Sequence, residues 1–220
     1  MQEQWKTMAR DVRAILLAGV ALFAAVGIAG CGQGADVAQP VQAAKENSEM
    51  RSEVPLTRPL SLSKAGEVVN VEFELPPPGP NAYAALMLGL RIARADAESA
   101  TALSFKLAES KVAAKVRLIR VQEGVLTTVP LIRNLPTLRD RVEVAPDGSV
   151  PGLVTSGVDT TMLEESNLLN PGLHYHIMKF ATAENVQPGH YRLTIDLDSD
   201  HPELQNEETE LLVAYFKKAK

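Results

Sequence analysis

Residues 67–75 have the sequence EVVNVEFEL, in which apolar and polar side chains alternate. On an extended chain, one face carries Val69, Val71, Phe73 and Leu75. The other face carries Asn70, Glu72 and Glu74. This period of two is typical of a β-strand that has one side in a core and the other in water. Residues 190–198, HYRLTIDLD, repeat the pattern near the end of the chain and predict a second such strand.

Further strand-like stretches lie between and beside these two segments: 82–94, 112–122, 125–134, 174–182 and 209–218. Residues 82–94 are apolar on nearly both faces, which predicts a central strand. Pro130 lacks a backbone N–H, so it places 125–134 at a sheet edge or a bulge. Glu123-Gly124 predicts a tight turn before that strand.

Helices are few in this pattern. Residues 96–110 fit one short helix with Leu103 and Leu107 four positions apart, and 76–81 and 145–161 are expected to be loops. Gln187-Pro188-Gly189-His190 predicts a β-turn that begins a hairpin, with Gly189 at positive φ. The sequence therefore predicts an all-β fold: an antiparallel β-sandwich of about six to eight strands with at most one or two short helices.

The N-terminus has the charge order of an export signal. Residues 1–13 are net positive, and residues 14–30, AILLAGVALFAAVGIAG, contain no charged side chain. The segment ends at Ile28-Ala29-Gly30-Cys31, which resembles the lipobox of bacterial lipoproteins and contains the single cysteine of the chain. The resemblance implies cleavage before Cys31 and lipidation of its side chain and amino group. The alternative is an uncleaved membrane helix, for which 17 residues are short.

Three segments follow from this interpretation: 1–30 as a lipoprotein signal peptide, 31–53 as the lipidated cysteine and a flexible tether, and 54–220 as the β-sandwich domain. Residues 32–53 contain no aromatic side chain and show no sustained period. A flexible tether of about 20 residues reaches roughly 25 Å, although 38–50 also fit a helix. Because Gly32 rather than an aspartate follows Cys31, the lipoprotein resemblance implies an outer-membrane anchor, with the domain facing the periplasm.

Charge and composition narrow the function classes. The chain has 22 basic and 27 acidic residues, a net charge of −5. Removal of residues 1–30 takes away three basic and two acidic residues and leaves 190 residues with a net charge of −6. This balance argues against a nucleic-acid partner, and one cysteine cannot form an intrachain disulfide or a multi-cysteine metal cluster. We expect no cofactor.

Three segments of the chain resemble the DUF5625 family of proteobacterial proteins: PLSLSKAGEVVNVEFELP (59–76), LIRV (118–121) and VQPGHYRLTIDLDSDHPEL (186–204). The matching positions of the last segment are Pro188, Gly189, Tyr191, Pro202 and Glu203. The resemblance spans roughly residues 55–218. It implies a compact β-sandwich on an exported protein, and the family has no assigned activity.

One pair of side chains is a candidate for chemistry. His174 and His176 lie two positions apart on a predicted strand, so both rings project from one face. Such a pair can bind Zn²⁺ with a third ligand from His190, His201 or a carboxylate. The plainer interpretation is that both lie on the solvent face of an edge strand. The sequence contains no nucleophile-elbow, phosphate-loop, dinucleotide or zinc-protease motif.

Two functions from different classes remain open. The first is a lipid-anchored, non-catalytic protein-interaction module, of which an inhibitor-type or immunity-type lipoprotein is one form. The alternative is a small periplasmic metal-binding protein or hydrolase that uses His174 and His176. We expect the first, with the membrane contacted through the lipid on Cys31 and a protein partner bound by the domain.

Overall fold

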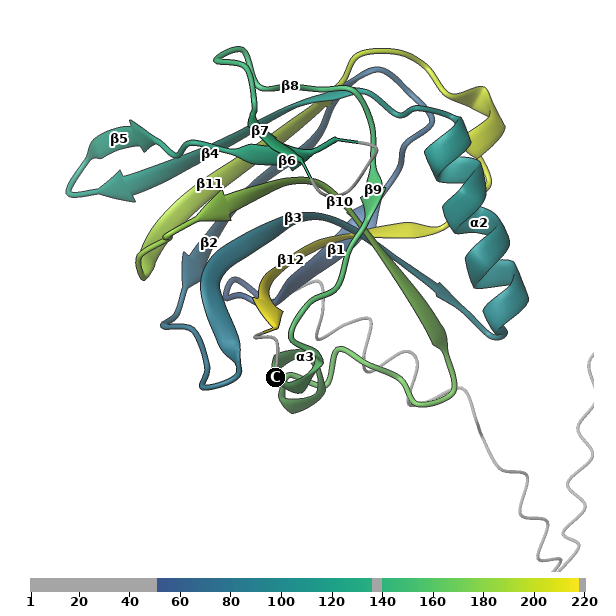
Figure 1. The fold of residues 1–220 in the computed structure, drawn as a ribbon, viewed down its shortest axis with the longest axis horizontal. Helices are drawn as coiled ribbons and strands as arrows, with labels where there is room; N and C mark the ends of the chain where they lie inside the picture. The colour runs from purple at the N-terminus through teal and green to yellow at the C-terminus, as the bar shows by residue number, and fades with distance from the viewer. Residues whose placement is uncertain (1–50, 136–139, 218–220) are drawn as a thin grey trace, which may run out of the picture. The chain divides into compact units, whose positions relative to one another are not determined.

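The structure, a computed structural model, describes residues 51–135 and 140–217, which form two antiparallel β-sheets (Figure 1). The seven-stranded sheet contains, in order, β1 (Leu56–Leu60), β12 (Thr209–Lys217), β3 (Ala82–Arg94), β10 (His174–Glu184), β6 (Ile132–Asn134) and β7 (Arg141–Glu143), and β9 (Val154–Thr155) also pairs with β10. The five-stranded sheet contains β2 (Gly66–Leu75), β11 (Gly189–Leu197), β4 (Ala114–Gln122) and β5 (Val125–Thr128), and β8 (Ser149–Val150) also pairs with β4.

The alternating strands supply the core between the sheets. From the five-stranded sheet, the inward side chains include Val69, Phe73, Leu75, Tyr191, Leu193 and Ile195. From the seven-stranded sheet they include Leu86, Leu88, Leu90, Phe180, Val213 and Tyr215. The rings of Phe73 and Tyr191 stack with centroids 5.9 Å apart. The predicted antiparallel sandwich is confirmed, and so is the alternation that predicted it.

The number of strands exceeds the expected six to eight. The described residues contain twelve, of which six have nine or more residues and correspond to the predicted stretches. The other six have only two to five residues. Pairing begins before the predicted domain boundary at residue 54, since the Glu74 N–H donates to the Ser52 carbonyl oxygen at 2.8 Å. Residues 1–50 lie outside the described part of the chain, and with them the predicted signal peptide, Cys31 and most of the tether.

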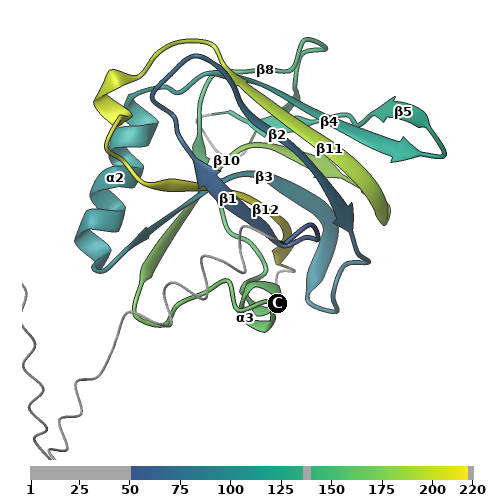
Figure 2. The ribbon, with the colours of Figure 1, turned by 180° about the vertical axis from the view of Figure 1, so that it is seen from behind.

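Two α-helices and one 3₁₀ turn accompany the described strands: α2 (Ala97–Glu109), α3 (Thr160–Glu165) and η1 (Pro202–Leu204). The predicted helix is confirmed as α2, which packs against β10 and β3 at one end of the sandwich (Figure 2). Asp96 caps it, because its carboxylate accepts the Ser99 N–H at 2.7 Å. Leu103 and Leu107, four positions apart, are both buried.

Three local predictions are wrong. Residues 125–134 form two strands, β5 and β6, in different sheets rather than one strand, because Pro130 cannot continue the ladder and the chain crosses between sheets there. The predicted edge position is confirmed for β5, which ends the five-stranded sheet. Residues 145–161 are not simply a loop: β8 and β9 satisfy some of their backbone groups by pairing, and α3 begins at Thr160. Residues 187–190 do not start a hairpin, since β10 and β11 belong to different sheets. The expected positive φ of Gly189 is confirmed at 143°.

Part of the outer face of the seven-stranded sheet is covered by the segment that contains α3. A second apolar cluster forms there from Met87, Val158, Leu163, Leu168, Leu212 and Ala214. Arg91 links the segment that contains α3 to the sheet. Its guanidinium pairs with Glu210 at 2.6 Å, donates to the Leu168 carbonyl oxygen, and lies 5.3 Å from the centre of the Tyr175 ring.

Candidate functional site

Strand β5 ends the five-stranded sheet, and all four of its residues are exposed. Val125 is 62% exposed and Leu126 is 58% exposed, although both are large apolar residues. The β4–β5 hairpin extends away from the rest of the sheet, at the end of the domain opposite α2 (Figures 1 and 2). Natural edge strands are commonly protected by charged side chains, but the sequence of β5, VLTT, contains none.

The turn of this hairpin fixes the register of β5. Glu123 has φ of 50° and Gly124 has φ of 81°, the pair of positive values that a type I′ turn requires. The turn predicted at these two residues is confirmed. It pairs Gln122 with Val125 across the ladder.

The register decides which backbone groups of β5 face outward. Residues that flank a two-residue turn bond to each other through their backbones, and this bonding then alternates along an antiparallel ladder. Val125 is the first bonded residue of β5, and Val129 fits the alternation because its N–H donates to the Leu118 carbonyl oxygen at 2.9 Å. The backbone N–H and C=O groups of Leu126 and Thr128 therefore point away from β4.

This outward edge is open in the part of the chain that the structure describes, where β5 pairs with β4 alone. Pro130 stands at the next outward position and has no N–H. The edge thus offers two donor–acceptor pairs, at Leu126 and Thr128, beside exposed apolar side chains. An extended segment of another chain can hydrogen-bond to such an edge and so extend the sheet by one strand.

His174 and His176 lie at the start of β10, next to α2. The His176 Nε2 is 3.2 Å from the Thr101 hydroxyl of α2. His174 is exposed and lies near Asp96. The pKa of Asp96 is lowered chiefly by its hydrogen bonds from Ser99, and His174 adds a smaller contribution.

The other two histidines lie elsewhere. His190 is on the outer face of the five-stranded sheet, where its Nδ1 lies 2.8 Å from Glu74 and its Nε2 lies 3.1 Å from Glu72. His201 is buried, between Ser199 at 3.3 Å and Glu203 at 3.2 Å. Within residues 51–135 and 140–217, no three His, Cys, Asp or Glu side chains are grouped so as to hold a metal ion. The structure therefore does not bring the expected third ligand to the His174–His176 pair.

The cluster around His190 is electrostatically coupled. Hydrogen bonds to Glu72 and then to Glu74 raise the pKa of His190, because both carboxylates favour the protonated ring. Arg192 also pairs with Glu72 and is the main cause that lowers the pKa of this carboxyl group. Because the two carboxylates are exposed, His190 and Arg192 are partly exposed, and all four groups bond to one another, we assign them to pairing between β2 and β11.

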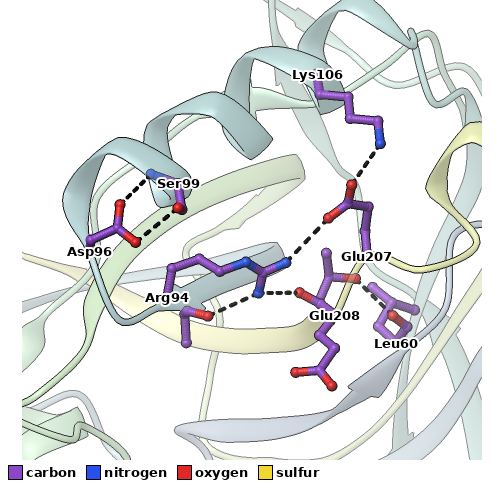
Figure 3. Close-up of polar contacts among 9 residues, drawn as sticks. Leu60, Arg94, Asp96, Ser99, Lys106, Glu207 and Glu208 are labelled. Atoms are coloured by element: carbon purple, nitrogen blue, oxygen red, sulfur yellow. Dashed lines mark hydrogen bonds and ion pairs between the residues drawn. The ribbon is translucent and has the colours of Figure 1, made fainter.

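A second ion-pair cluster joins α2 and the end of β3 to the segment just before β12 (Figure 3). The Glu207 carboxylate accepts a hydrogen bond from Lys106 at 2.6 Å and lies 3.4 Å from the Arg94 guanidinium. Arg94 also donates to the Glu208 carbonyl oxygen at 3.1 Å. The bond from Lys106 is the main cause that lowers the pKa of Glu207. These contacts are internal, and they hold the helix against the sheet.

Comparisons with family models, with curated proteins and with solved structures find no match to this chain. The resemblances to DUF5625 and to the lipobox stay predictions from the quoted residues. Among the described residues, no helix has the length and apolar character needed to cross a bilayer. The sequence predicts the open edge of β5 only in part. Pro130 predicts an edge or a bulge, but nothing in the sequence indicates which backbone groups face outward.

Proposed function

We propose that the domain is a protein-binding module that acts without turnover and takes an extended segment of its partner onto the open edge of β5. One observation carries the proposal: two large apolar side chains, Val125 and Leu126, are more than half exposed beside outward-facing backbone groups. Apolar side chains on an open edge favour pairing with another chain, which is why natural proteins commonly block such edges. β5 itself contains no charged residue or proline that would prevent such pairing, and the first proline after it is Pro130.

The chemistry of the edge specifies the partner segment. Main-chain hydrogen bonds to Leu126 and Thr128 supply affinity, and side chains at alternate positions supply specificity. The segment needs an apolar side chain that lies beside Leu126. After cleavage before Cys31 the chain has a net charge of −6, which steers basic partner surfaces toward it and weakens with salt.

The N-terminal pattern supports a location for this binding. A signal of residues 1–30 followed by a lipidated Cys31 places the domain in the bacterial cell envelope, anchored to the outer membrane and facing the periplasm. Envelope proteins and incoming toxins pass this position. An inhibitor-type or immunity-type lipoprotein therefore fits the proposal.

Capture from an envelope extract tests the proposal. The immobilised protein is expected to retain a defined protein, with a lower yield at high salt. Leu126→Asp should abolish retention, because a buried unpaired carboxylate opposes the apolar contact. Phe105→Asp is the matched control: Phe105 is 65% exposed on α2, at the opposite end of the domain, and its loss should leave retention unchanged.

Two outcomes contradict the proposal. Equal loss of retention in both aspartate variants would show that the effect is not specific to the edge. Turnover of an esterase, phosphatase or peptidase substrate that is lost in both His174→Ala and His176→Ala would instead favour the hydrolase.

A further inference from the structure

The outer face of the seven-stranded sheet contains a hollow of about 610 Å³ beside the cover formed by α3. Its volume falls within the roughly 300–1,000 Å³ of small-molecule sites. Residues from five strands and their ends line it, among them Tyr83, Arg141, Lys179, Thr182, Glu184 and Phe216. The strands involved are β3, β6, β7, β10 and β12, so the hollow exists only in the assembled sheet.

Positive charge dominates the hollow. Arg141, Lys179 and Lys217 face a single carboxylate, that of Glu184, on a chain that is acidic as a whole. Glu184 forms an ion pair with Arg141. Among the described residues Lys179 forms no ion pair, although the charge of Glu184 acts on it; its ammonium group lies 4.8 Å from the centre of the Phe216 ring.

The environment of the Lys179 ammonium group favours the binding of an anion beside it. Its side chain is half-buried, and burial, reinforced by the positive charge of Arg141, lowers its pKa, while the negative charge of Glu184 opposes this shift in part. An ammonium group that loses water and gains no hydrogen-bond acceptor is destabilised. A bound anion offsets this cost.

The other residues that line the hollow favour contact with an aromatic ring of a ligand. Tyr83 is 47% exposed and Phe216 is partly exposed, so both rings are accessible from the hollow. Offset or edge-to-face contacts between aromatic rings are favourable at such a site. The hydroxyl group of Thr182 adds a neutral polar group nearby.

We propose that this hollow binds an aromatic monocarboxylate, with the carboxylate accepting hydrogen bonds from the Lys179 ammonium group and the ring contacting Tyr83 and Phe216. A single negative charge matches the one half-buried ammonium group, that of Lys179, since Arg141 is already paired with Glu184 and the Lys217 side chain is exposed to water. A phosphate group is a poorer match: phosphate sites commonly use several converging donors, such as arginines or a helix N-terminus, and no described helix lines this hollow.

Calorimetric titration with phenylacetate as the probe tests this site. We expect saturable binding to the protein, and about tenfold weaker binding to Lys179→Met, which keeps an apolar side chain but removes the charge-assisted hydrogen bond. Lys115→Met, on the other sheet, is the matched control and should bind like the wild type. Phenylacetamide, which lacks the charge, should bind weakly and equally to all three proteins. Tyr83→Ala should weaken phenylacetate binding but leave acetate binding unchanged.

Any of three results would refute the site. The first is phenylacetate binding that does not saturate, the second is equal phenylacetate affinity of the wild type and Lys179→Met, and the third is a loss of affinity in Lys115→Met as large as that in Lys179→Met. Displacement of phenylacetate by an equal concentration of inorganic phosphate would overturn the assignment to a carboxylate. The readout is independent of partner capture on β5, because the hollow and β5 belong to different sheets.

Discussion

Gly189 joins the two sheets through a backbone conformation that other residues rarely adopt, with φ of 143°. A β-carbon at this position would meet only the Arg120 side chain, at 3.6 Å, which is an ordinary contact. The cost of a side chain is therefore backbone strain rather than a clash. We expect Gly189→Val to lower the free energy of unfolding by about 1–3 kcal/mol, measured by denaturant titration. An unchanged midpoint would contradict this account of the crossover.

His190 makes part of the stability depend on pH. Its pKa is raised in the folded state, so its stabilising contribution is complete below the unfolded value of 6.5 and is lost as the pH rises through the folded value. The pKa of Glu72 is lowered, so its contribution is complete above 4.5 and is lost as the pH falls. The network is therefore fully formed between these two values. The difference in unfolding free energy between the wild type and His190→Gln should be larger at about pH 5.5 than at about pH 8.5. A difference that is independent of pH would argue against these contacts.

Helix α2 depends on its N-cap. The Asp96 carboxylate accepts hydrogen bonds from both the backbone N–H and the hydroxyl group of Ser99, at 2.7 and 2.9 Å. Asp96→Ala should lower the free energy of unfolding, because the alanine cannot accept the hydrogen bonds of the cap. Thermal or denaturant unfolding measures it, with the exposed Asp198→Ala as the control. Equal effects of the two substitutions would mean that the cap contributes nothing.

Long and short elements differ in how far the sequence predicts them. β2 and β11 have nine or more residues of alternating polarity, and this pattern alone specifies which face is buried. Strands of two or three residues, such as β8 and β9, contain too few positions to show a period, so their pairing depends on tertiary contacts. Pro130 marks a break in 125–134, but the choice of sheet on each side of it is also tertiary.

The candidate sites show the same limit. The Glu123-Gly124 turn and Pro130 bound the open edge of β5 in the sequence, yet its outward groups follow only from the register with β4. The hollow around Lys179 joins side chains from strands far apart in the chain, so no local pattern predicts it. The spacing of His174 and His176 correctly placed them on one strand, but it contained no information on the packing of α2 beside them.

At the scale of the whole molecule, the proposed lipid anchor on Cys31 would decide where the domain acts. If Cys31 carries the lipid, Cys31→Ala should leave an unprocessed precursor and abolish labelling by a clickable palmitate analogue. The cause is chemical, because the thiol is the acyl acceptor and alanine has none. Gel mobility and in-gel fluorescence measure both effects. Labelling that persists in the alanine variant would end the lipoprotein interpretation.

Amide hydrogen exchange with and without the captured partner tests strand addition on β5 most directly. The amide protons of Leu126 and Thr128 face the open edge, whereas that of Thr127 faces β4. Binding of an extended segment should slow exchange strongly at Leu126 and Thr128, because their N–H groups gain acceptors, and should change Thr127 much less. Unchanged exchange at Leu126 and Thr128 in the complex would contradict the claim that β5 is the binding edge.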